Sequence, residues 1–512
     1  MSSVVADAAP SPSPFAEPEH LDVLIVGAGL SGIGAAYHLQ TSLPHKTYAI
    51  LEARDAIGGT WDLFRYPGIR SDSDMYTLGF PFRPWNSDES IADGPVIRQY
   101  IRDTAREYGI DRRIRFGHRV VGAAWSTAEQ RWTAEVEGRG TITCSFLLMC
   151  TGYYRYDEGY TPAFPEIERF KGQLVHPQFW SDDVDYEGKR VIVIGSGATA
   201  VTLVPALAEK AAHVTMLQRS PSYVVSLSKQ DPLAKRARRL LPERQAYNLI
   251  RWKNALLMAL TFQLCRRRPA LVKGLIRKLL ERLLPPGYDI DTHFSPRYNP
   301  WEQRLCVVPD ADLFEAIGAG RASVVTDQIG AFTETGVRLA SGGELEADLI
   351  VTATGLNLLL LGGLKLAVDG EEVNLAERLI YRGCMLSGIP NAALTFGYTN
   401  ASWTLRCDLT CQYVCRLLAH MDANGYSSCT PRNHDSTMAV RPFVDFSSGY
   451  FQRSLASFPK QGSRGPWRLH QNFLRDWASL RAVPVNEPSM EFSRDGSATA
   501  AASSRAPVAA VA

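Results

Sequence analysis

Two glycine-rich turns constrain the fold of this chain more than any other feature. The first spans residues 27–32 (Gly-Ala-Gly-Leu-Ser-Gly), and the second spans residues 195–200 (Gly-Ser-Gly-Ala-Thr-Ala), about 170 residues later. Each follows an apolar run typical of a buried strand and precedes a helix-like segment. In such units the glycines let the backbone approach a pyrophosphate, and the positive end of the helix attracts it. The sequence therefore predicts an α/β chain with two Rossmann-type dinucleotide-binding domains.

The residues that follow the next strand of each unit distinguish the two dinucleotides. The strand predicted at 47–51 ends in Glu52, whose carboxylate can accept hydrogen bonds from free ribose hydroxyls. The strand predicted at 214–217 is followed by Gln218 and Arg219, and a cation at this place suits a 2′-phosphate. We therefore expect one dinucleotide with a free ribose, interpreted as FAD, and one NADPH.

Composition limits the other classes of function. The chain of 512 residues is long enough for two or three domains, and its net charge of +2 predicts no nucleic-acid partner. Its nine cysteines include no CxxC pair, which argues against a redox dithiol and a zinc ribbon. Cys407, Cys411 and Cys415 share one helix face, which we interpret as core packing, and no metal site is predicted.

The order of motifs predicts the domain boundaries. Two apolar strands run into Thr151-Gly152 and Thr354-Gly355, and we interpret both as crossings between the nucleotide domains. The predicted parts are disordered tails at 1–19 and 486–512, an FAD-binding domain at 20–155 and 356–485, an NADPH-binding domain at 156–223 and 298–355, and a basic helical subdomain at 224–297.

The helical subdomain is unusually basic. Residues 229–282 contain fifteen Lys or Arg and three acids, a net charge of +12, and residues 270–284 have apolar and basic faces at helical spacing. The favoured interpretation is that its apolar face packs on the NADPH domain and shapes the pocket. Peripheral membrane contact stays open as the alternative. No segment resembles a membrane span or a signal peptide, so we expect a cytoplasmic protein.

The segment between the turns carries a family signature. Phe170, Gly172, His176 and Trp180 match the pattern FxGxxxHxxxW, and Ser181 stands where a proline often follows. This pattern resembles that of type I Baeyer–Villiger monooxygenases, which are class B flavoprotein monooxygenases. Together with motifs at 58–61, 65–72, 298–305, 397–404 and 459–464, it makes residues 20–480 similar to the ethionamide-activating subgroup of that family.

The resemblance implies a set of cofactor contacts. The residues expected at FAD are Gly27, Gly29, Ser31, Gly32, Glu52, Thr60, Trp61, Asp62, Leu63, Asp72 and Val120. Those expected at the nicotinamide end of NADPH are Arg70, Ser71 and Asp72. Those expected at its phosphates are Gly195, Ser196, Gly197, Ala198, Thr199, Ala200, Val201, Arg219 and Ser220. His176 is interpreted as a hinge residue and not as a proton-transfer group.

The resemblance also implies the chemistry. Arg304 would be the active-site cation, oriented by Asp72, and it would stabilise a C4a-peroxyflavin that attacks a ketone. From the residues alone, a surface ion pair of Arg304 with Glu302 or Asp310 would be favoured. The expected partners are O₂ and a ketone or thioether, and the expected activity is Baeyer–Villiger oxidation to esters or lactones, with sulfide oxidation beside it.

Three other functions are weighed against this one. The nearest is an N- or S-hydroxylating flavin-containing monooxygenase that uses the electrophilic hydroperoxyflavin. A reductase of the disulfide type is disfavoured by the missing CxxC pair. A regulatory protein that senses NADPH without catalysis is the third.

Overall fold

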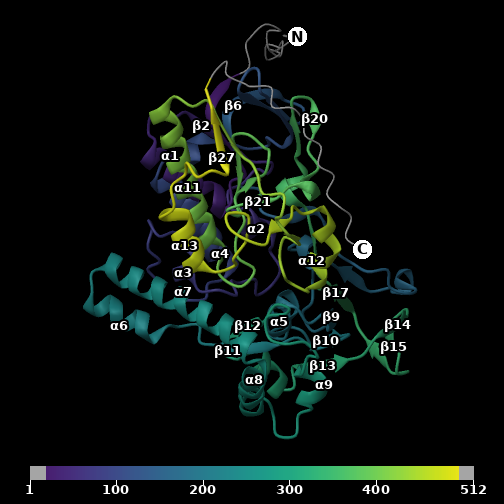
Figure 1. Cartoon of the computed structure of the whole chain (residues 1–512). Helices are drawn as coiled ribbons and strands as arrows, with labels where there is room; N and C mark the ends of the chain where they lie inside the picture. The colour runs from purple at the N-terminus through teal and green to yellow at the C-terminus, as the bar shows by residue number, and fades with distance from the viewer. Residues whose placement is uncertain (1–18, 495–512) are drawn as a thin grey trace, which may run out of the picture.

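The two glycine turns lie at the carboxyl ends of strands in two separate sheets of the computed structural model, which describes residues 19–494 (Figure 1). The first turn joins β1 (His20–Val26) to α1 (Leu30–Ser42). The second joins β9 (Arg190–Ile194) to α5 (Ala198–Leu207). The predicted fold class, α/β with two Rossmann-type units, is therefore confirmed.

The first sheet has the strand order β20-β19-β4-β5-β6-β1-β2-β3, and β23 also pairs with β6. β1 runs parallel to β2 and β6. Val23 and Ile25 face the core under α1 and α11, whereas Leu24 and Val26 face a second core on the opposite side. Because β1 is buried on both faces, it reads as a continuous apolar run. The other strands are β2 (Tyr48–Leu51), β3 (Ile114–Arg115), β4 (Val120–Ser126), β5 (Arg131–Val136), β6 (Gly140–Met149), β19 (Lys365–Val368), β20 (Glu371–Glu372) and β23 (Ala392–Leu394).

Helices and short hairpins complete the first unit. The helices are α2 (Thr60–Leu63), α3 (Met75–Leu78), α4 (Gly94–Glu107), α11 (Trp403–Asn424), α12 (Gly449–Ser454) and α13 (Phe473–Arg481). The short strand pairs are β21 (Ile380–Tyr381) with β22 (Met385–Leu386) and β25 (Val440–Arg441) with β26 (Gln461–Gly462).

The second sheet is entirely parallel, in the order β13-β10-β9-β17-β8. One face packs on α5 and α10, and the other packs on a three-stranded antiparallel sheet through Phe332 and Val337. The elements are β8 (Gln173–Val175), β10 (His213–Gln218), β13 (Ala322–Thr326), β17 (Leu349–Thr352), α10 (Asp312–Gly318), β14 (Ile329–Phe332), β15 (Gly336–Leu339) and β16 (Glu344–Glu346).

The chain crosses between the sheets twice, once after β6 and once after β17. The crossing segments β7 (Tyr154–Gly159) and β18 (Leu356–Leu358) pair with each other in antiparallel orientation. They follow Thr151-Gly152 and Thr354-Gly355, so the predicted crossings are confirmed. The two sheets are thus joined by a two-stranded connector next to both glycine turns.

The basic segment differs from its predicted description in two ways. It starts with a strand, β11 (Val224–Leu227), which pairs with β12 (Cys306–Pro309), and helices follow only after that strand. Its helices also contact both units. Ala237 and Tyr247 belong to the core of the first unit, and Ile276 belongs to the core of the second. The helices are α6 (Pro232–Leu240), α7 (Glu243–Arg267), α8 (Pro269–Leu283) and α9 (Ile290–Phe294).

The predicted C-terminal tail is wrong for residues 486–494. β27 (Met490–Ser493) pairs with β24 (Ser428–Pro431), and Met490 is buried. Glu487 forms an ion pair with Arg382. At the other end, Glu19 bonds Arg115. Residues 1–18 and 495–512, which make up the rest of both predicted tails, lie outside the described residues.

Candidate functional site

A cavity of 1160 Å³ lies between the two units and reaches both glycine turns. It exceeds the range of about 300–1,000 Å³ that is usual for one small ligand. The predicted site residues that line it are Gly27, Gly29, Ser31, Glu52, Thr60, Trp61, Arg70, Ser71, Asp72, Val120, Gly195, Ser196, Gly197, Ala198, Thr199, Arg219, Ser220 and Arg304. Of the other predicted residues, all within the described chain, the lining lacks Gly32, Asp62, Leu63, Ala200, Val201, Phe170, Gly172, His176 and Trp180.

The first turn needs glycine for close packing. Gly27 has a φ of +105°, and a Cβ there would lie 2.6 Å from the carbonyl oxygen of Cys150. A Cβ on Gly32 would lie 1.8 Å from the carbonyl oxygen of Gly27. Gly32 therefore lets α1 pack against the turn, which explains its absence from the cavity wall.

The second turn leaves space beside its backbone. Gly195 has a φ of +137°, and a Cβ there would lie 2.3 Å from the carbonyl oxygen of Ala353. A Cβ on Gly197 would meet no described atom within 4 Å. Since Gly197 lines the cavity at the start of α5, a phosphate can approach the backbone and the positive end of this helix.

Glu52 is held beside the first turn by backbone donors. Its Oε2 accepts from the Ala28 amide at 2.7 Å, and its Oε1 accepts from the Arg54 amide at 2.9 Å. Burial raises the pKa of this carboxyl, and the two amide bonds oppose that shift. Each oxygen keeps acceptor capacity that a ribose hydroxyl can use.

Asp62 acts behind the cavity wall. Its buried carboxylate pairs with Arg54 at 2.7 Å and with Arg102 at 3.0 Å, and Arg98 lies 3.6 Å away. Arg54 itself lines the cavity. Asp62 therefore positions Arg54, a cation of the cavity wall, without lining the cavity itself. Leu63 lies next to Asp62 on α2.

Arg219 is placed where a phosphate group could meet it. Ser196 donates to the carbonyl oxygen of Ser220 at 3.0 Å, which ties the second turn to the end of β10. Arg219 lines the cavity and is exposed. Within residues 19–494 it forms no ion pair with a carboxylate.

Arg70 and Ser31 have protein partners at the wall. Arg70 forms a two-point contact with Asp312 of α10, at 2.5 and 3.3 Å, and thus joins the two units. Ser31 accepts from the indole Nε1 of Trp403 at 2.9 Å.

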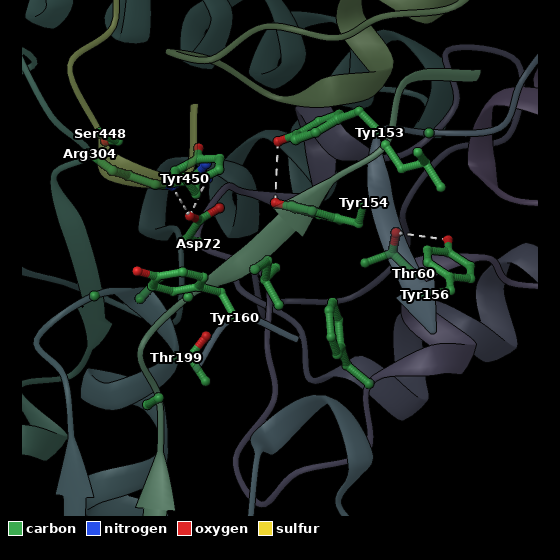
Figure 2. A pocket seen from close by; sticks show the side chains of 18 of the residues that line it. Thr60, Asp72, Tyr153, Tyr154, Tyr156, Tyr160, Thr199, Arg304, Ser448 and Tyr450 are labelled. Carbon is green, nitrogen blue, oxygen red and sulfur yellow. Dashed lines mark hydrogen bonds and ion pairs between the residues drawn. The ribbon is translucent and has the colours of Figure 1, made fainter. Parts of the chain in front are cut away.

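Arg304 and Asp72 meet across the cavity from different units (Figure 2). Arg304 Nε donates to Asp72 Oδ2 at 2.8 Å, and a terminal guanidinium nitrogen bonds the same oxygen. Glu302 bonds Asn299 instead, and Asp310 accepts from the Lys229 amide. The surface pair favoured from the residues alone is therefore not formed. The Asp72 charge raises the pKa of Arg304 well above its usual value, so the cation is permanent.

Tyrosines surround Arg304, and the sequence analysis did not identify them. Tyr450 of α12 lies beside Arg304, and the arginine charge opposes the rise in the pKa of its hydroxyl. The Tyr153 hydroxyl donates to that of Tyr154 at 3.2 Å, and Figure 2 shows all three tyrosines among the residues that line the pocket. Burial raises the pKa of Tyr450, so its hydroxyl stays neutral. The dense tyrosines at 153–160, directly after a predicted crossing, were a usable signal, whereas Tyr450 carried none.

The signature residues lie at the connector and not at the cavity. The Gln178 amide donates to His176 Nδ1 at 3.2 Å, so Nε2 carries the proton and donates to the carbonyl oxygen of Gly355 at 3.1 Å. Burial lowers the pKa of His176. A Cβ on Gly159 would lie 2.2 Å from this ring, so the ring packs directly on β7. Both ring nitrogens are engaged by the backbone, so neither is free for proton transfer, and the hinge role of His176 stays a prediction.

The other three signature residues are structural. Phe170 packs near Phe332, with ring centroids 6.4 Å apart. A Cβ on Gly172 would lie 2.6 Å from the carbonyl oxygen of Asp348. Trp180 contacts Tyr186 edge to face.

The described chain offers neither a metal site nor a membrane span. Among residues 19–494, no three His, Cys, Asp or Glu side chains cluster as metal ligands. All nine cysteines are buried and unpaired, and burial raises the pKa of Cys407 to about 12. Within the same range, no helix is both long and apolar enough to cross a bilayer.

Comparison with known sequences identifies the family. Residues 84–359, more than half of the chain, match the family described as flavin-binding monooxygenase-like, and residues 25–87 match the NAD(P)-binding Rossmann-like domain. The FAD-containing monooxygenase EthA of Mycobacterium tuberculosis is 56% identical over 480 residues, which cover 93% of this chain and 98% of that protein. The EthA of Mycolicibacterium smegmatis is 54% identical over 490 residues, covering 95% of this chain and all of that protein.

Solved structures share the fold at lower identity. An oxidized steroid monooxygenase bound to NADP superposes with a TM-score of 0.73 at 22% identity, covering 93% of this chain and 100% of that one. Cyclohexanone monooxygenase from Rhodococcus sp. Phi1 bound to NADP⁺ gives 0.72 at 17% identity, with the same coverage. The chain therefore belongs to the flavin-binding monooxygenase-like family, with the FAD-containing monooxygenases EthA among its relatives, and is a flavoprotein monooxygenase.

Proposed function

We propose that this enzyme inserts one oxygen atom of O₂ into ketones to give esters or lactones, and that it oxidises thioethers as a side activity. The observation that carries this proposal is the permanent cation of Arg304, held by Asp72 on the wall of the cavity that both glycine turns reach. We place the protein in the cytoplasm.

The two turns would hold one cofactor each. The first turn with Glu52 would bind FAD, and the second turn with Arg219 would bind NADPH. The open space beside Gly197 and the lack of a carboxylate partner for Arg219 within residues 19–494 support the second assignment. When bound, FAD would supply the redox chemistry that couples the oxidation of NADPH to the use of O₂. We keep the domain boundaries predicted from the sequence as part of this proposal, with the basic helices between the two units.

Arg304 would stabilise the negative charge that develops on the reacting oxygen atoms. The guanidinium stabilises negative charge on the transferred oxygen and on the ketone oxygen as it becomes an oxyanion. Asp72 accepts two bonds from the guanidinium and holds it at the cavity wall, where Tyr450 lies beside it. A fixed cation keeps the attacking oxygen anionic, and an anionic oxygen attacks carbonyl carbon in preference to sulfur or nitrogen.

The neutral hydroxyl beside Arg304 supports the thioether activity. The neutral Tyr450 hydroxyl can donate a hydrogen bond to the transferred oxygen, and such a bond reduces the negative charge of that oxygen and favours attack by sulfur. An N- or S-hydroxylating monooxygenase is therefore the second candidate function. NADPH consumption with matched panels of ketones, thioethers and amines, followed by mass analysis of the products, separates the two. Exclusive formation of S- or N-oxides would favour the second.

Glu52→Gln is expected to lower FAD occupancy. An amide is a weaker acceptor for ribose hydroxyls than a carboxylate, and the loss of a charge-assisted bond costs about 1.5–3 kcal/mol, or about 10- to 150-fold in affinity. The measurement is the ratio of flavin to protein absorbance after dialysis, with the exposed Glu137→Gln as control. An unchanged ratio would place Glu52 away from the ribose.

Tyr450→Phe is expected to slow ester formation about tenfold, because it removes the hydroxyl beside the Arg304 guanidinium while the ring remains. FAD content and flavin reduction by NADPH should stay at parental values. Tyr426→Phe, just after the C-terminal end of α11, is the matched control. Equal product rates for Tyr450→Phe and the parent enzyme would remove Tyr450 from the site.

A further inference from the structure

The helical segment carries a second apolar face that nothing in the described chain covers. We call this face the apolar strip. Its members are exposed large side chains of α7, α8 and α13: Leu249, Trp252, Leu256, Leu257, Leu260, Leu264, Leu271, Leu275, Leu474 and Trp477. Leu257 is 57% exposed and Leu260 is 66% exposed. Such a run exceeds the scattered apolar residues of an ordinary surface and indicates a binding site.

α7 is amphipathic in an unusual way. Its inner face is buried in the core of the first unit through Ala246, Tyr247 and Ile250. Leu249, Leu256 and Leu260 recur at helical spacing on the outer face. A surface helix of a globular protein needs only one apolar stripe, so the outer stripe is not explained by folding.

The α7 and α13 parts of the strip are in contact. The Trp252 ring lies 5.4 Å from the Phe473 ring and 6.0 Å from the Trp477 ring, centroid to centroid. Figure 1 shows α6 and α7 projecting from the side of the molecule, with α13 beside α7. The strip therefore lies on a projecting surface that a flat partner can reach.

Two groups of exposed basic residues accompany the strip. Arg239 and Arg244 are exposed where α6 meets α7, and residues 266–268 are three exposed arginines where α7 meets α8. Arg266 lies 3.5 Å from Asp445, but within residues 19–494 neither Arg267 nor Arg268 has a carboxylate partner. The same helices thus carry exposed apolar side chains and two groups of exposed arginines.

We propose that the apolar strip rests on a membrane surface containing anionic lipid, with α7 lying in the plane of the interface. Leucine and tryptophan side chains enter the boundary between headgroups and acyl chains, and the arginines meet lipid phosphates. No described helix can cross the bilayer, so the contact is peripheral. A two-fold dimer through the same strip would bring like-charged arginine clusters together, which disfavours a second copy as the occupant.

This surface changes the interpretation favoured from the sequence. There, the favoured interpretation packed the apolar face of the segment on the NADPH domain and kept membrane contact as the alternative. The structure assigns Val272, Ile276 and Leu280 of α8 to the core of that domain, but leaves Leu271 and Leu275 of the same helix exposed.

The test is co-sedimentation of the full-length holoenzyme with phosphatidylglycerol-containing vesicles and with pure phosphatidylcholine vesicles. Binding should need the anionic lipid and should weaken between low ionic strength and about 0.15 M salt, where charges are screened over about 8 Å. The joint change of Arg266, Arg267 and Arg268 to Gln should lower the partition coefficient on the order of 100-fold. The joint change of Leu257 and Leu260 to Gln should lower it at least about tenfold.

Matched control variants distinguish binding through this surface from non-specific electrostatic or hydrophobic binding to the vesicles. Arg112, Arg338 and Lys365, changed together to Gln, remove the same charge elsewhere, and Val96→Gln removes an exposed apolar side chain from α4. Both controls should bind vesicles as the parent does, and all variants should turn over a soluble ketone normally. Absence of binding to anionic vesicles, or equal binding by the strip variants, would overturn the proposal. So would a dimer in light scattering that only the leucine variant dissociates.

Discussion

Arg304→Ala is expected to abolish ester formation while the enzyme still binds FAD and is still reduced by NADPH. Arg304 lines the cavity, and its guanidinium pairs with Asp72 across the two units. Loss of a preorganised charge at a developing oxyanion costs about 100- to 1,000-fold in kcat. Stopped-flow spectra would show flavin reduction at the parental rate, and product analysis would show little ester.

Two companions make the Arg304 result specific. Arg304→Lys keeps a charge but has no planar fork, so it should recover only part of the activity. Arg297→Ala removes an exposed arginine nearby and should behave as the parent. Ester formation near the parental rate in Arg304→Ala would refute the role proposed for this cation.

Arg219→Ala should weaken NADPH binding and leave NADH binding nearly unchanged. Only NADPH carries the 2′-phosphate, and loss of a charge-assisted contact costs about 1.5–3 kcal/mol, or about 10- to 150-fold in affinity. The concentration dependence of anaerobic flavin reduction with each coenzyme measures both affinities.

A control and a clear contrary result accompany the Arg219 test. Lys210→Ala removes an exposed cation from the same unit and should change neither affinity. Equal losses for NADPH and NADH in Arg219→Ala would mean that this residue does not read the 2′-phosphate.

The parts of the site that could be predicted from the sequence are those formed by residues close together along the chain. Each strand, its glycine turn and the start of its helix lie within about a dozen positions, so both turns could be predicted directly from the sequence. Glu52 could be predicted because it directly follows the next strand of the first unit. Arg304 was different, because residues alone favoured a pair with Glu302 or Asp310. Its contact with Asp72 joins positions 232 residues apart, and only the family resemblance pointed to it.

Long-range contacts explain what the sequence analysis missed. Tyr450 lies on a short helix without a motif, yet it contacts Arg304. Residues 490–493 have the composition of a tail, but pairing with β24 orders them. In the basic segment, periodicity revealed the apolar residues without telling which partner covers them. The structure divides these residues between two cores and an exposed strip.

The central claim is oxygen insertion beside a ketone carbonyl, and labelled oxygen tests it most directly. The purified holoenzyme is given NADPH, a soluble ketone and O₂ carrying heavy oxygen, and the product is analysed by mass and fragmentation. The account predicts an ester or lactone with one heavy atom in its ring or ester oxygen. Consumption of NADPH with the ketone unchanged, while thioethers or amines become labelled oxides, would contradict it.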